Sequence, residues 1–136
     1  MWAERAAAAR QAGPASLIDG LLKIWFTAAA IARDDPAVQY VRSTIGKCSG
    51  EGYALACEAL AAADLRSLSA QISAATLVIC GDDDIPSFLE ASRLLSYTIR
   101  HATLSWIPQA RHASVLERSE VGLQIMTAFL KGEAGC

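Results

Sequence analysis

The sequence predicts an α/β fold in which a helical region, residues 1–70, precedes a β-α-β-α unit, residues 71–136. Apolar side chains recur at helical spacing through the first region, and no strand pattern occurs before residue 70. The run from Ala75 to Cys80 is short, apolar and rich in β-branched residues, which is typical of a strand buried on both faces of a parallel sheet. A second strand is expected at 102–107 after an intervening helix, so the two strands should be parallel.

Four helices are expected in the first region and two in the second. In the first region they cover residues 3–11, 15–27, 34–46 and 50–63. The third should start at Asp34-Asp35-Pro36, since aspartate caps helices and proline fits the first turn. In the second region they cover 86–97 and 119–131, with Gly132 ending the last. The apolar residues expected to face inward are Leu17, Leu21, Leu22, Trp25, Phe26, Val121, Ile125, Phe129 and Leu130.

Composition excludes several classes of function. The chain of 136 residues fits one domain, and its net charge of −2 without a basic run argues against nucleic-acid binding. Apolar runs such as 25–31 are far shorter than the roughly 20 residues of a membrane span. Residues 1–10 carry Glu4 and lack an apolar core, so they are not expected to be a signal peptide. The cysteine pattern makes the cytoplasm the expected compartment. With 53% hydrophobic and only 19% charged residues, an apolar face covered by a partner is also expected.

The cysteine spacing gives no reason to expect a metal or another cofactor. Cys48, Cys57, Cys80 and Cys136 match neither a zinc pattern nor a C-x-x-C redox motif. Cys80 ends the apolar run and is expected to be a buried free thiol. Gly46-Lys47-Cys48-Ser49-Gly50 fits G-x-C-x-G, but a nucleophile elbow needs a preceding strand, and here a helix precedes it. A helix–helix turn is therefore the favoured interpretation of this motif.

Candidate catalytic groups follow both predicted strands. The first strand leads into Asp82-Asp83-Asp84 and the second into a loop with Arg111 and His112. Functional groups of α/β sheets lie at the carboxyl ends of strands, so a carboxylate and an imidazole could meet there. A carboxylate bonded to a histidine fixes its tautomer and stabilises the imidazolium. A solvated turn is the alternative for the aspartates, and Arg111 is expected to be a surface cation.

The two loops resemble those of α/β-hydrolases. The stretch from Thr76 to Asp84 is similar to the strand and G-x-x-D loop that supplies the acid of the catalytic triad, which implies Asp84 as the acid. The stretch from Ile107 to Glu117 is similar to the loop of the triad histidine, which implies His112 as the base and Glu117 as the start of the last helix. His101 precedes its strand and is expected to be exposed at the opposite end.

The helical region narrows the resemblance to 3-oxoadipate enol-lactonases, which hydrolyse a lactone in aromatic catabolism. Trp25-Phe26-Thr27, Glu51-Gly52-Tyr53 and Asp64-Leu65-Arg66 are similar to the helical cap of these enzymes. The resemblance implies a small lactone or ester as substrate, with Trp25 and Tyr53 as candidate contacts. A place in the core of the cap is the alternative for Trp25.

The sequence lacks one part of the catalytic machinery of this family. The family's first strands, oxyanion-hole loop and G-x-S-x-G elbow have no counterpart in the sequence, so we expect a truncated α/β-hydrolase core without its serine. One hypothesis is a hydrolase that is inactive alone and whose serine comes from a complementary N-terminal half. The other is a non-catalytic, self-associating module, a homodimer, because two parallel strands alone leave open edges.

Overall fold

The computed structural model describes residues 1–133, and Cys136 lies outside them. Helices and strands alternate only in the second half of the chain. In order, the elements are α1 (Trp2–Ala12), the 3₁₀ helix η1 (Pro14–Leu17), α2 (Ile18–Trp25), α3 (Ala28–Ala32), α4 (Pro36–Gly46), α5 (Gly50–Ala62), α6 (Arg66–Ser69), β1 (Thr76–Gly81), α7 (Pro86–Thr98), β2 (Ala102–Ile107), α8 (Ser114–Glu117) and α9 (Ser119–Leu130). The α/β class predicted from the sequence is confirmed.

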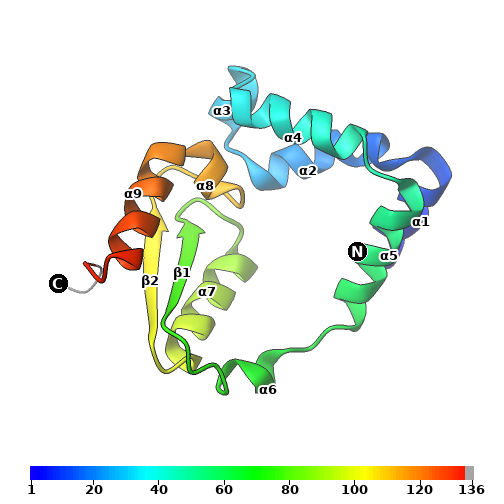
Figure 1. Ribbon diagram of the computed structural model, residues 1–136. Coiled ribbons are helices and arrows are strands. Elements are labelled where there is room, and N and C mark those ends of the chain that lie inside the picture. The colour runs from blue at the N-terminus through cyan, green and yellow to red at the C-terminus, as the bar shows by residue number, and fades with distance from the viewer. Residues whose placement is uncertain (134–136) are drawn as a thin grey trace.

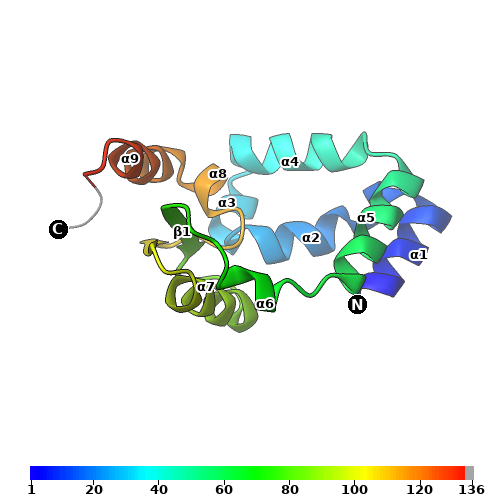
Figure 2. The same cartoon turned by 60° about the horizontal axis from the view of Figure 1, so that its bottom comes forward.

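The elements form two regions (Figure 1). Helices α2 and α4 lie side by side, as do α1 and α5, and together they make the helical cap. The sheet lies apart from α1 and α5, with α7 and α9 on its opposite faces (Figure 2). The boundary predicted at residue 70 falls at the end of α6, on the segment that leads from α5 to β1.

The sheet has two parallel strands among the described residues. Its register runs from Thr76 opposite Ala102 to Gly81 opposite Ile107, so the predicted β-α-β unit is confirmed. The expected burial of β1 on both faces is wrong for most of its length, because residues 76–79 are only half-buried. Among residues 1–133, two strands with one long helix on each face leave part of the sheet surface uncovered and one edge of each strand unpaired.

The cap has a hydrophobic core of its own. Its buried residues are Leu21, Leu22, Phe26, Ala30, Val38, Val41 and Ile45. The predicted helix 15–27 is interrupted, because Phe26 has an extended backbone and the Thr27 side chain caps α3 by accepting from Ala30 N. Neither α3 nor the other short helix, α6, was predicted from the sequence. Asp35 occupies the cap position of α4, but its carboxylate binds Arg33 and makes no cap hydrogen bond.

The last helix, α9, begins at Ser119 as its apolar pattern predicts and ends at Leu130, one residue before the predicted end. Glu117 was expected from the resemblance to start this helix, but it ends the separate short helix α8, which was not predicted. Leu130 is 83% exposed, so its predicted inward orientation is wrong, whereas Phe129 is half-buried. Gly132 has φ of +75° directly after the helix, as expected of a glycine that ends it. None of the helices formed by residues 1–133 combines the length and apolarity that crossing a membrane requires.

Candidate active site

The loops after the two strands are joined by backbone hydrogen bonds. Asp82 N donates to Ile107 O over 3.1 Å, and Asp83 N donates to Ala110 O over 3.1 Å. Gly81 permits this close approach, because a Cβ at that position would lie 2.1 Å from Ala110 O. The end of β1 is thereby held against the loop that carries the histidine.

The three aspartates of the first loop differ in their surroundings. Asp82 is exposed, and its Oδ1 accepts from Gln109 N over 2.7 Å, which supports the left-handed backbone of Gln109 at φ of 53°. Asp83 is exposed. Asp84 has only 2% of its side chain exposed, so the solvated-turn alternative does not describe this residue.

Asp84 and His112 meet as the sequence predicts. Asp84 Oδ2 lies 3.0 Å from His112 Nδ1, while Oδ1 accepts from the Ile85 backbone over 2.8 Å. Since a carboxylate can only accept, Nδ1 carries the proton and Nε2 of the neutral ring keeps its lone pair. The imidazole, with 38% of its side chain exposed, is therefore oriented to take a proton at Nε2.

Two aromatic rings hold the imidazole in place. Phe88 from α7 stacks on His112 with ring centroids 4.0 Å apart, and Trp25 from the cap lies at 6.4 Å in a tilted arrangement.

Burial, together with the nearby Asp84 charge, raises the pKa of the Cys80 thiol, so Cys80 is the neutral buried thiol expected. Cys48 lies exposed in the turn between α4 and α5, with no strand before it. His101 is exposed just before β2, at the other end of the strand from His112.

Glu117 connects the histidine loop to the cap. Its carboxylate accepts from Thr27 N over 3.2 Å, from the Thr27 hydroxyl, and from Arg111 N over 3.2 Å. Ala113 N also donates to Trp25 O over 2.8 Å. No local pattern in the sequence predicts this role, because Thr27 and Glu117 are 90 positions apart.

Arg111 also connects the two regions, so the expectation of a surface cation is wrong. Its Nη1 donates to Lys23 O over 2.6 Å, and its buried Nε has no hydrogen-bond partner among the described residues. The guanidinium therefore lies between the histidine loop and the end of α2.

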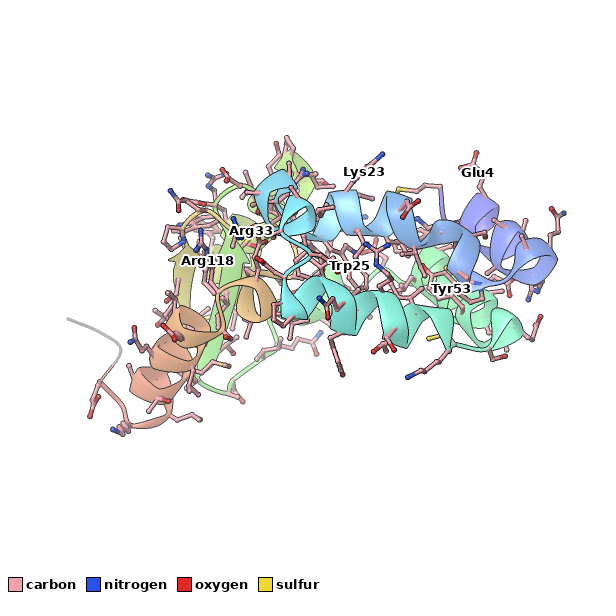
Figure 3. The ribbon with its side chains drawn as sticks, turned by 90° about the horizontal axis from the view of Figure 1, so that it is seen from above. Glu4, Lys23, Trp25, Arg33, Tyr53 and Arg118 are labelled. Atoms are coloured by element: carbon pink, nitrogen blue, oxygen red, sulfur yellow. The ribbon has the colours of Figure 1, made fainter. Side chains whose placement is uncertain are left out.

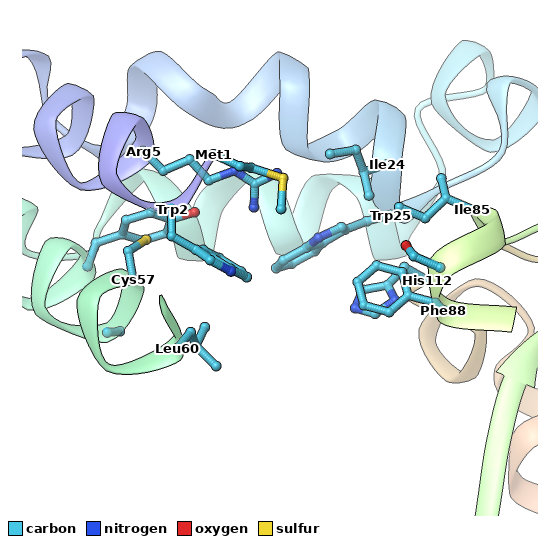
Figure 4. Close-up of a pocket in the computed structure, with 13 residues that line it drawn as sticks. Met1, Trp2, Arg5, Ile24, Trp25, Cys57, Leu60, Ile85, Phe88 and His112 are labelled. Atoms are coloured by element: carbon cyan, nitrogen blue, oxygen red, sulfur yellow. The ribbon is translucent and has the colours of Figure 1, made fainter. Parts of the chain in front are cut away.

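A pocket of about 340 Å³ opens beside His112 (Figure 4). Both candidate contacts lie on its wall, Trp25 near the imidazole and Tyr53 on α5. Seen from above, Trp25 lies between the strands and Tyr53 (Figure 3). Burial raises the pKa of the Tyr53 hydroxyl, so this group is a neutral hydrogen-bond donor at pH 7. The lining residues are Met1, Trp2, Arg5, Ile24, Trp25, Tyr53, Ala56, Cys57, Leu60, Ile85, Ser87, Phe88 and His112.

The pocket is largely apolar, and its wall offers no metal site. Within residues 1–133, no group of three histidine, cysteine or acidic side chains is placed to hold a metal ion. What the pocket can provide is a hydrophobic slot with one proton acceptor at its edge.

An acid after one parallel strand and a histidine after the next, beneath a helical cap, define half of an α/β-hydrolase. Solved structures agree. The enol-lactonase from Burkholderia xenovorans LB400 matches 96% of this chain and 50% of its own, with a TM-score of 0.90 and 34% identity. A hydrolase from Pseudomonas aeruginosa PA01 matches with a TM-score of 0.81 and 31% identity, covering 95% of this chain and 49% of its own.

Curated relatives narrow the similarity to 3-oxoadipate enol-lactonases. The chain is 32% identical over 130 residues to 3-oxoadipate enol-lactonase 2 of Acinetobacter baylyi, and equally to enol-lactonase 1 of that organism. The match covers 96% of this chain but 48% of each relative, so the chain spans about half the length of the curated relatives it matches. No family model matches. The resemblance inferred from the sequence is thus confirmed: the chain corresponds to half of an α/β-hydrolase and is similar to 3-oxoadipate enol-lactonases.

Proposed function

We propose that this chain supplies the acid and the base for hydrolysis of a small ester or lactone, with an enol-lactone as the substrate by analogy with its relatives. The observation that supports the proposal most directly is the 3.0 Å contact between Asp84 Oδ2 and His112 Nδ1 at the edge of an apolar pocket. In aromatic catabolism, such a reaction opens a lactone ring to a carboxylate.

The roles of the two residues follow from their protonation. A serine hydroxyl attacks the carbonyl carbon, and His112 Nε2 takes its proton while Asp84 stabilises the resulting imidazolium. When the tetrahedral intermediate collapses, the C–O bond of the ester breaks and His112 returns the proton to the leaving oxygen. A water molecule then attacks the acyl-serine, with His112 again taking and returning the proton, and the carboxylic acid is released.

On our proposal, this chain does not provide the nucleophile. The described strands end in the Asp84 and His112 loops, and neither forms the strand–turn–helix elbow of a nucleophilic serine. Ser87 lines the pocket, but no hydrogen bond joins it to His112 among residues 1–133. We assign the serine and the oxyanion hole to a complementary hydrolase half, and we expect residues 1–136 alone to be inactive, because those groups supply much of the rate.

The proposal is tested by restoring the missing half. A chimera in which this chain replaces the matching half of the Acinetobacter baylyi enol-lactonase 2 should hydrolyse the enol-lactone, and the isolated chain should not. In the chimera, His112→Ala and Asp84→Asn should lower kcat on the order of 10³–10⁴-fold. Ser87→Ala is the matched control and should leave kcat unchanged. Robust turnover by the isolated chain, or an active chimera that tolerates His112→Ala, would contradict the assignment.

A second candidate function, a non-catalytic module that pairs with another protein surface, is favoured by the uncovered sheet. Each strand has one unpaired edge among the described residues, and large apolar side chains are exposed nearby. They are Leu94, Leu95, Tyr97, Leu116, Leu123 and Leu130. We propose that this surface pairs with a second copy in a homodimer when no complementary half is present. Light scattering at micromolar concentration should then give twice the mass of the chain, and a stable monomer would contradict the dimer.

We also propose a cytoplasmic location for the protein. The described cysteines Cys48, Cys57 and Cys80 are all free thiols, which suits a reducing compartment. Fractionation of the producing cells with a tagged chain tests this, and recovery in an extracellular or membrane fraction would contradict it.

A further inference from the structure

The backbone of His112 is held in place through the residues on either side of it. Among the residues that the structure describes, the backbone N–H and C=O of His112 itself form no hydrogen bond. On one side, Arg111 N donates to the Glu117 carboxylate over 3.2 Å. On the other side, Ala113 N donates to Trp25 O over 2.8 Å. Both peptide neighbours of the histidine are thus fixed, while its side chain lies at the wall of the pocket.

These hydrogen bonds all lead to one short segment of the cap. Besides Arg111 N, Glu117 accepts the backbone N–H and the hydroxyl of Thr27. Trp25 and Thr27 flank the link between α2 and α3, and Figures 1 and 2 show this link beside α8. Trp25 also lines the pocket, with its ring centroid 6.4 Å from that of His112. The histidine and one wall of the pocket are therefore fixed to the same segment.

A carboxylate is the side chain that suits the position of Glu117. All the groups that it meets are donors, and a carboxylate accepts through both of its oxygens. Oε1 takes the two donors of Thr27, and Oε2 takes Arg111 N. An amide at this position would turn an NH₂ group toward one of these donors. The Arg111 side chain adds a bond to Lys23 O over 2.6 Å, but through a flexible chain, whereas Glu117 fixes the peptide N–H itself.

We propose that Glu117 is a positioning residue for the base, because it fixes the peptide of Arg111 to the cap and so sets the place of the His112 backbone. Asp84 orients the imidazole ring, and Glu117 places the backbone that carries it. Asp84 is buried and bound to Ile85 N, so it cannot follow a displaced histidine. The inference rests on the proposed function for the use of His112 as a base, but the geometry is measurable without any reaction.

The tautomer of the His112 ring reports whether the ring is in place. Contact with Asp84 holds the ring proton on Nδ1, whereas a histidine in water favours Nε2. Nitrogen NMR shifts of the full chain distinguish the two forms above about pH 8, where an ordinary imidazole is neutral, and the exposed His101 is the internal reference. Glu117→Gln should lower the ratio of the Nδ1–H to the Nε2–H form of His112 about tenfold, the effect of losing one hydrogen bond to a charged group. The His101 ring should not change.

Glu120→Gln is the matched control, because it removes the same charge from an exposed position in the first turn of α9. It should leave the His112 tautomer unchanged. Urea unfolding separates positioning from stability: a Glu117→Gln chain that is less stable but keeps the original tautomer would overturn the proposal. If Glu117→Gln does not fold, two variants of Thr27 decide. Thr27→Val should shift the tautomer and Thr27→Ser, which keeps the hydroxyl, should not, so equal His112 spectra of the two would also overturn it.

The chimera described above gives a second readout. In it, Glu117→Gln should lower kcat about 10²-fold, the cost of misplacing a catalytic group by about 1 Å. KM should stay close to that of the unaltered chimera, because Trp25 and the rest of the cap wall keep their places. A raised KM with an unchanged kcat would contradict the positioning role. An inactive chimera with the tautomer shift intact would refute only the proposed function, and an active chimera without the shift would refute only the role of Glu117.

Discussion

The cap and the strand region of this chain bury their side chains in different ways. In the cap, seven hydrophobic residues between Leu21 and Ile45, from α2, α3, α4 and the link between α2 and α3, form one buried cluster. In the strand region the buried positions include the polar residues Asp84, Ser92 and Ser114, and most of β1 and β2 is only half-buried. The cap is thus a self-contained helical core, whereas the strand region holds its site through loop hydrogen bonds and leaves apolar surface uncovered.

The difference shows where stability and chemistry reside in the molecule. Burial of apolar surface is the main favourable contribution to folding, and most of the buried hydrophobic residues among 1–133 lie in the cap. The Asp84–His112 pair lies in the other region, which is joined to the cap by contacts such as Ala113 N to Trp25 O at 2.8 Å. A substitution in the cap core should therefore change stability, and a substitution at the strand ends should change the geometry of the pair.

The largest effect is expected at the centre of the cap. Phe26 is fully buried, so Phe26→Ala should lower the free energy of unfolding by about 3–5 kcal/mol, the cost of removing a buried aromatic ring. Glu90→Ala on α7 is the control from the strand region, where the side chain is exposed, and should change stability by no more than about 0.5 kcal/mol. Urea unfolding followed by circular dichroism measures both. Similar losses at the two positions would contradict the contrast between the regions.

A smaller effect is expected where the two loops meet. Gly81→Ala places a Cβ 2.1 Å from Ala110 O, and the resulting displacement should cost about 1–3 kcal/mol, as overpacking usually does. It should also separate Asp84 from His112, which a changed pH titration of the His112 ring in NMR spectra would reveal.

Gly20→Ala is the matched substitution in the cap. Nothing lies within 4 Å of a Cβ at this helical position, so the alanine should stabilise the chain by about 0.5–1 kcal/mol. A Gly81→Ala chain as stable as the original, with an unchanged His112 titration, would show that the strand ends tolerate movement.

The smallest effect is expected at the surface of the cap. Hydrogen bonds from Arg10 lower the pKa values of Glu51 and Glu58, so the folded chain gains stability above the ordinary glutamate pKa and loses it as the pH falls through the lowered values. Arg10→Met should remove this gain. The stability difference between the two chains should therefore be small at pH 7, shrink in acid, and shrink in high salt, because exposed ion pairs are weak and screened. A difference that is constant from pH 7 to pH 3 would contradict this origin.

Several parts of the fold could be predicted because their signals are local. The β-branched run at 75–80 and the alternation of strands with helices predicted the parallel pair within one residue. The start of α3 at Thr27 was not predicted, because the helical pattern of 15–27 is continuous and only the Thr27 side chain, as the N-cap, starts a new helix there. Leu130 was misplaced because periodicity gives a helix face but does not show where the surface that covers the face ends.

The sequence by itself determined the order of the strands and the longer helices and indicated Asp84 and His112 as the candidate acid and base, because a strand, its loop and their motif are adjacent along the chain. Only the tertiary structure decided that Asp84 is buried and bonded to His112, that Glu117 and Arg111 connect the loop to the cap, and that Arg5 faces the same pocket as Trp25. These relations join residues up to 90 positions apart. Their distances depend on how the helices pack on one another and on the sheet, and no local pattern carries that information.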